Sequence, residues 1–85
     1  MQITYGLHAE NQLKERGISK RLIEEILSNP EQIINSIKGR KIAHKVISEG
    51  KVKFLYRVIY VIEKSKFEVI SAYKTRKIVK YWVKK

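Results

Sequence analysis

Apolar residues recur at helical spacing over the first thirty positions of the chain. A short helix is predicted from Leu7 to Arg16, because Gly17 can take the left-handed conformation that commonly ends a helix. A second helix is expected between Ser19, a favourable N-cap residue, and Pro30, which stops it. The second helix has the clearer pattern, since four apolar residues lie on one face: Leu22, Ile23, Ile26 and Leu27.

After Pro30 the apolar spacing changes from helical to alternating. Turn-forming residues at 38–40, 49–51 and 64–66 separate the strands, and these connections are short enough only for antiparallel hairpins. The third segment is apolar on both faces, as expected for a central strand covered by helices on one side and partly occluded on the other. The four predicted strands are about Glu31 to Ile37, Lys41 to Ser48, Val52 to Glu63 and Phe67 to Tyr73.

The segment from Arg76 onward fits two structures. Its apolar residues fall on one helical stripe, but alternation at Ile78, Lys80 and Trp82 also permits a fifth strand. The helix is preferred. The sequence therefore predicts one α+β domain over residues 1–85, with two N-terminal helices packed on a four-stranded antiparallel meander sheet and a short basic C-terminal helix or fifth strand.

Charge narrows the choice of partner. Nineteen Lys and Arg against eight acids give the 85-residue chain a formal charge of +11, which attracts polyanions over a Debye length of about 8 Å.

The absence of cysteine excludes a disulfide scaffold, and two histidines without clustered acids make a metal site unexpected. No cofactor is expected. Without a signal-peptide pattern or an apolar run of about 18 residues, a cytoplasmic protein with no membrane contact is predicted.

Arg57 interrupts the otherwise apolar central strand. A guanidinium in that position needs a partner or a solvated cleft. It can form an ion pair with an acid such as Glu10, Glu15 or Glu68, or it can bind a phosphate through its donor fork. Alternation along the strand does not say which face of the sheet the helices cover.

Candidate proton-transfer groups lie elsewhere in the chain. His8, at the start of the first helix, offers an imidazole as acid or base and would reach the rim of the sheet, unless it is an ordinary surface residue. His44 is expected to be only a sheet-face side chain. Tyr73 ends the last strand beside a run of cations, where it would stack on a base or donate a proton, although solvated strand ends are also often charged. Nucleotide hydrolysis and acyl transfer are disfavoured, since no phosphate loop or nucleophile elbow is present.

Three short motifs lie in the predicted elements: His8-Ala9, then Glu15-Arg16-Gly17-Ile18 followed by Ser19, and Val69-Ile70-Ser71-Ala72-Tyr73. With the order of elements, they resemble the RelE-like toxin superfamily, including its HigB and BrnT groups. The closest likeness is to small uncharacterised domains of that superfamily, in which a His-Ala pair opens the first helix. The resemblance covers nearly the whole chain.

The resemblance implies a metal-independent endoribonuclease, the toxin of a toxin–antitoxin pair, acting on messenger RNA and sometimes only in the ribosome. Such an enzyme moves a proton from the ribose 2′-hydroxyl and supplies one to the 5′-oxygen, leaving a 2′,3′-cyclic phosphate. The implied partners are RNA and an acidic antitoxin. The implied catalytic residues are His8, Arg57 and Tyr73. The implied phosphate-binding residues are Arg16, Lys74, Arg76, Lys77 and Lys80.

Two non-enzymatic functions compete with this one. A basic domain can dock on RNA or DNA with salt-sensitive, sequence-tolerant affinity. A protein-interaction domain can present the same basic face to an acidic partner. The sequence leaves the oligomeric state open. The cations expected at a nucleic-acid surface are Lys20, Arg21, Lys74, Arg76, Lys77 and Lys80.

Overall fold

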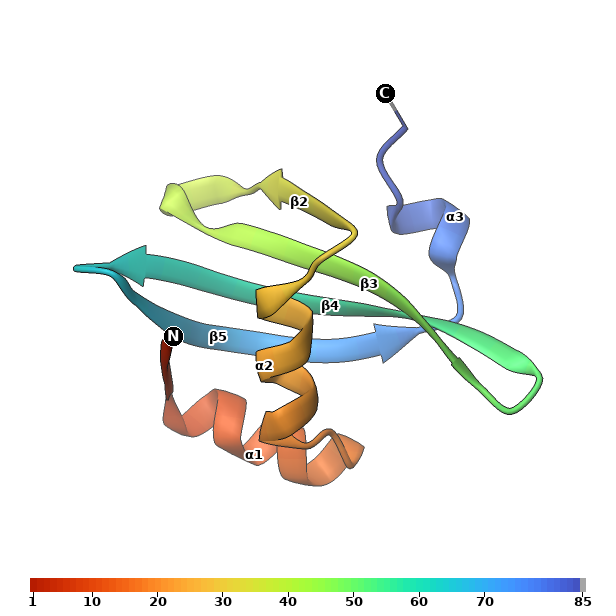
Figure 1. Ribbon diagram of the computed structural model, residues 1–85, viewed down its shortest axis with the longest axis horizontal. Helices are drawn as coiled ribbons and strands as arrows, with labels where there is room; N and C mark the ends of the chain where they lie inside the picture. Colours follow the sequence, from red (N-terminus) through yellow and green to blue (C-terminus); the bar gives the residue numbers. More distant parts are fainter. Residues whose placement is uncertain (85) are drawn as a thin grey trace.

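Two α-helices lie against one face of a five-stranded β-sheet in the computed structural model, which describes residues 1–84 (Figure 1). The strand order is β1-β5-β4-β3-β2. The α+β class predicted from the sequence is confirmed. The helices are α1 (Leu7–Arg16), α2 (Lys20–Ser28) and α3 (Ile78–Tyr81), and the strands are β1 (Gln2–Tyr5), β2 (Gln32–Asn35), β3 (Lys41–Glu49), β4 (Val52–Glu63) and β5 (Lys66–Thr75).

The ends of α1 and α2 follow the sequence closely. Gly17 adopts φ of 64° after α1, and its N–H bonds carbonyls of the last turn, so the predicted glycine C-cap is confirmed. The Ser19 hydroxyl accepts a hydrogen bond of 3.1 Å from the Leu22 N–H at the start of α2. This contact satisfies one of the backbone donors that a helix leaves unpaired at its N-terminus.

The predicted meander is confirmed for β2 to β5, which pair antiparallel in chain order. The sheet nevertheless has a fifth strand that the sequence prediction missed, because β1 pairs in parallel with the start of β5. Only four residues long and joined to a strand far away in sequence, β1 gives no hairpin signal. The fifth strand allowed at the C-terminus is wrong, since α3 forms there. The strand predicted for Glu31 to Ile37 is shorter, because Ile37–Gly39 forms a 3₁₀ turn.

A one-residue bulge in β5 decides which side chains face the helices. Ile59 pairs with Ser71 and Tyr60 pairs with Val69, so Ile70 is left without a partner. Val69 and Ala72 are consequently both buried under the helices, and Tyr73 lies on the opposite face. The core between sheet and helices contains Ala9, Leu13, Ile18, Ile23, Ile26, Leu27, Ala43, Tyr56, Val58, Tyr60, Val69 and Ala72.

Candidate functional site

A row of four polar side chains crosses the sheet on the face opposite α1 and α2. The register pairs Gln32 of β2 with His44 of β3, His44 with Arg57 of β4, and Arg57 with Tyr73 of β5. Residues directly opposite each other on neighbouring strands project to the same face. Tyr56 and Val58 are buried under the helices, so Arg57 and the rest of this polar row lie on the other side.

Hydrogen bonds connect the polar row from end to end. Gln32 Oε1 accepts from His44 Nδ1 at 2.9 Å, and Arg57 Nε donates to His44 Nε2 at 3.0 Å. Arg57 also donates from one terminal nitrogen to the Tyr73 hydroxyl oxygen. The Gln32 amide is oriented by the Val83 backbone, whose N–H donates to Oε1 and whose carbonyl accepts from Nε2. These partners assign the imidazole proton of His44 to Nδ1.

His44 is fully buried and neutral. Burial, with a smaller effect from the Arg57 cation, lowers the pKa of His44 from 6.5 to about 4. Both ring nitrogens are already hydrogen-bonded, so His44 is not free to take a proton from a ligand. The sheet-face position expected from the sequence is confirmed, but its role in holding Arg57 was missed, because the pairing of β3 with β4 sets that contact.

Arg57 has no acidic partner within residues 1–84. Of the acids expected as alternatives, Glu10 pairs instead with Lys20. The two side chains that accept hydrogen bonds from Arg57 are His44 and Tyr73, and neither is a carboxylate. No buried side-chain nitrogen in the described chain lacks a partner, so the Arg57 Nη2 atom, for which no hydrogen bond is found, is not fully buried. The charge of Arg57 is therefore not compensated by an acid within residues 1–84.

Arg16 approaches Tyr73 around the edge of the sheet. β1 covers β5 only from Lys66 to Val69, which leaves the edge beyond it open. α1 fills this gap, since Gln12 Oε1 accepts from the Ala72 N–H at 3.1 Å and Arg16 donates to the Ala72 carbonyl at 3.1 Å. The Arg16 guanidinium carbon is 5.8 Å from the centroid of the Tyr73 ring, and that of Arg57 is 5.6 Å from it. Two arginines thus flank one tyrosine.

Two predicted site residues, His8 and Lys74, do not lie beside Arg57 and Tyr73. His8 is exposed at the start of α1, about 12 Å along the helix axis from Arg16 at 1.5 Å per residue. Lys74 follows Tyr73 in β5 and so projects to the helix side of the sheet. There it forms an ion pair of 2.8 Å with Glu49 and lies 4.5 Å from the Phe54 ring centroid. The prediction that Lys74 lies beside Tyr73 at the site is therefore wrong, because successive side chains of a strand project to opposite faces.

The three remaining predicted cations follow Tyr73 in the chain. Arg76, Lys77 and Lys80 are exposed, in the turn after β5 and on α3. Lys80 Nζ lies 5.3 Å from the centroid of Tyr81. The predicted C-terminal helix is confirmed but is a single turn, and Trp82, which was expected on its apolar stripe, lies just after it. These cations extend the positive charge beyond the two arginines.

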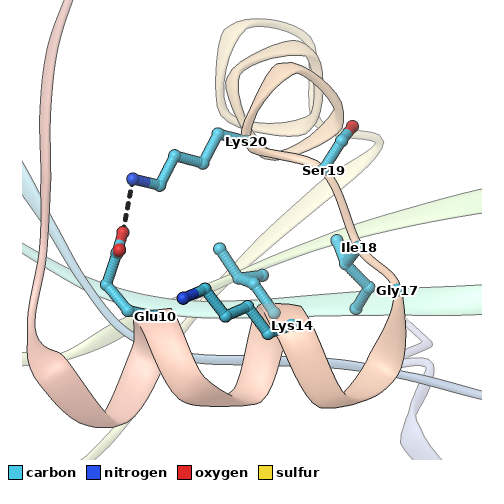
Figure 2. Close-up of a pocket in the computed structure, with 7 residues that line it drawn as sticks. Glu10, Lys14, Gly17, Ile18, Ser19 and Lys20 are labelled. Carbon is cyan, nitrogen blue, oxygen red and sulfur yellow. Dashed lines mark ion pairs between the residues drawn. The ribbon is translucent and has the colours of Figure 1, made fainter.

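A separate cavity of about 440 Å³ lies between α1 and the start of α2 (Figure 2). Leu13 and Ile18 supply its apolar lining, and Lys20 forms an ion pair with Glu10 at its edge (Figure 2). This pair offsets the charge that Lys20 would otherwise offer to a nucleic acid. The cavity includes none of the residues of the polar row.

Neither a metal cluster nor a membrane span is found in the part of the chain that the structure describes. No three His, Cys, Asp or Glu side chains among residues 1–84 are grouped to hold a metal ion. No helix there is long and apolar enough to cross a membrane.

The fold and the polar row define a small α+β domain with two arginines and a tyrosine gathered at one end of its sheet. A family model described as "Domain of unknown function (DUF4258)" matches residues 5–74, so the chain belongs to that family. The match includes the whole polar row and Arg16, while α3 lies beyond it. Among curated proteins and among solved structures, no significant match to the chain was found.

Proposed function

We propose that this protein is a metal-independent endoribonuclease of the RelE-like type, the toxin of a toxin–antitoxin module. In this proposal Arg57 and Arg16 bind the scissile phosphate and Tyr73 transfers a proton. The main support comes from Arg57, whose guanidinium is fixed by two neutral side chains and meets no acid within residues 1–84. A fixed, uncompensated arginine stabilises negative charge that develops on a phosphate.

Tyr73 is suited to act as the acid. Its oxygen accepts a hydrogen bond from Arg57, so its own O–H proton is free to be donated. The ribose 2′-oxygen attacks phosphorus, the bond from phosphorus to the 5′-oxygen breaks, and the departing 5′-oxygen takes the Tyr73 proton. The 2′-hydroxyl proton passes to water, and the products carry a 2′,3′-cyclic phosphate and a 5′-hydroxyl.

A second candidate is an RNA-binding domain that does not cleave. It is favoured by the shortage of proton-transfer groups, because His44 is neutral with both nitrogens bonded and His8 lies away from Tyr73. The same residues would then hold a phosphate without turnover. In either case the formal charge of +11 draws the protein to RNA, and an acidic antitoxin would be attracted by the same field.

The test is cleavage of a messenger RNA, with and without ribosomes, in the presence of EDTA. We expect the wild-type protein to cut, leaving 2′,3′-cyclic ends, and to arrest growth when its expression is induced. Tyr73→Phe should bind RNA as before but cut about 10²- to 10⁴-fold more slowly, which is the usual contribution of a positioned acid. Tight RNA binding with no cleavage would establish the second candidate instead.

A further inference from the structure

The chain after β5 folds back over the polar row. The centroid of the Tyr81 ring is 4.2 Å from the Arg57 guanidinium carbon, and Tyr81 also contacts the Tyr73 ring edge to face at 6.5 Å. Trp82 stacks on His44 with ring centroids 6.0 Å apart, and the Val83 backbone makes two hydrogen bonds to Gln32. α3 therefore lies on the side of the sheet away from α1 (Figure 1). A flat aromatic ring covers the arginine that is otherwise open to an anion.

The ring of Tyr81 has the position that a nucleobase would take. Proteins that recognise single-stranded RNA stack unpaired bases on aromatic rings and on arginine guanidinium planes. One nucleotide can use both parts of a guanidinium, because its phosphate accepts hydrogen bonds from the N–H edge while its base stacks on the flat face. We propose that the face of Arg57 covered by Tyr81 is a stacking subsite for an unpaired RNA base, and that Tyr81 fills this subsite in the free protein. The inference rests on the proposed RNA function.

The covering segment is short, and its Tyr81 and Trp82 side chains are only half-buried. α3 is one turn long, contains no buried residue, and a turn of that length has little stability of its own. Val79 is 84% exposed and Val83 is 45% exposed. The segment also lies outside the family match, which ends at residue 74. An RNA base that stacks on Arg57 must displace the contacts of Tyr81, Trp82 and Val83 with the polar row, none of which belongs to the core under α1 and α2.

Two short single-stranded oligomers test the subsite. Both carry 2′-O-methyl riboses, so that neither can be cleaved, and one lacks its bases. We expect Tyr81→Ala to bind the base-containing oligomer about 3- to 30-fold more tightly than wild type, the factor that corresponds to one cation–π contact no longer being displaced. Binding of the abasic oligomer should not change. Tyr81→Leu keeps apolar bulk without an aromatic face and should show the same gain in affinity. It replaces Tyr81→Ala in the test if Tyr81→Ala folds poorly.

Val79→Ala is the matched control, because Val79 lies on the same turn but is almost fully exposed. Its affinity for both oligomers should equal that of wild type. Trp82, the single tryptophan of the chain, gives a second measurement. Trp82 follows Tyr81 directly in the chain, so we expect displacement of Tyr81 to move Trp82 off His44. The base-containing oligomer should then shift Trp82 emission to longer wavelength and make this emission easier to quench.

Each other outcome counts against the subsite. If Tyr81→Ala and Tyr81→Leu bind the base-containing oligomer no more tightly than wild type, or if Trp82 emission is unchanged at saturation, the subsite is wrong and the phosphate site at Arg57 stands. An equal gain for both oligomers would mean that Tyr81 covers the phosphate site, with no base recognition. If no variant binds either oligomer, the RNA function is contradicted and the subsite with it.

Discussion

Arg57 and His44 lie opposite each other on the neighbouring strands β4 and β3, and Arg57 Nε donates a 3.0 Å hydrogen bond to His44 Nε2. A neutral imidazole orients the guanidinium without cancelling its charge. An acid in the same place would fix Arg57 as firmly but would compete with any bound phosphate. The pair therefore keeps a cation ordered and uncompensated on the sheet face where Tyr81 lies over it.

The buried position of His44 predicts a large loss of stability on truncation. His44→Ala removes the partner of both Arg57 and Gln32, ends the stacking of Trp82 and leaves a cavity. We expect the free energy of unfolding to fall by about 2 to 4 kcal/mol. Urea denaturation measures this change. His8→Ala is the control and should change the free energy by less than about 0.5 kcal/mol, because His8 is exposed. A similar small loss in both variants would contradict the role of His44.

His44 also predicts how stability depends on pH. Its pKa is about 4 when folded and 6.5 when unfolded, because burial first and then Arg57 disfavour the imidazolium. Between these values the unfolded chain binds more protons, so the free energy of unfolding decreases as pH falls from 6.5 to about 4. The stability that depends on neutral His44 is fully present above pH 6.5 and lost below about pH 4. It amounts to no more than about 3 kcal/mol of the free energy of unfolding. Denaturation at several pH values should show this slope in wild type and a flatter one in His44→Asn.

Arg16 is predicted to serve both the fold and the site. Arg16→Gln removes the hydrogen bond to the Ala72 carbonyl at the open edge of β5 and one of the cations beside Tyr73. We expect a loss of about 1 kcal/mol in the free energy of unfolding and about tenfold weaker RNA binding. Lys14→Gln removes the same charge from an exposed position on α1 and should change neither property appreciably. Equal effects of the two substitutions on RNA binding would show that only net charge matters.

The sequence predicted those parts of the fold that local signals determine. Gly17, Ser19 and Pro30 delimit the helices, and the short turns impose the antiparallel meander. β1 was missed because its partner in β5 is distant in sequence. The bulge at Ile70 has no local signature either, yet it puts Tyr73 on the same face as Arg57.

The candidate site was predicted only in part, because it too depends on contacts between residues that are distant in sequence. Arg57 was recognisable as one charge within an apolar strand, and Tyr73 as the end of the last strand. His44 and Gln32 depend on the register between strands, which the sequence alone did not give. His8 and Lys74 were grouped with Tyr73 from their places in the chain, whereas helix geometry and strand alternation separate them from it.

Two substitutions that each remove one positive charge test most directly whether RNA binds at Arg57. Arg57 lies on the face away from α1 and α2 with no acid paired to it, while Lys74 lies on the helix side and is paired with Glu49. In a titration with fluorescent single-stranded RNA, Arg57→Gln should weaken binding about 10- to 100-fold, as expected for a lost charge-assisted hydrogen bond. Lys74→Gln should stay within about threefold of wild type, because its charge is already offset and screened. Equal weakening by both substitutions, or none by Arg57→Gln in a folded protein, would contradict a phosphate site at Arg57.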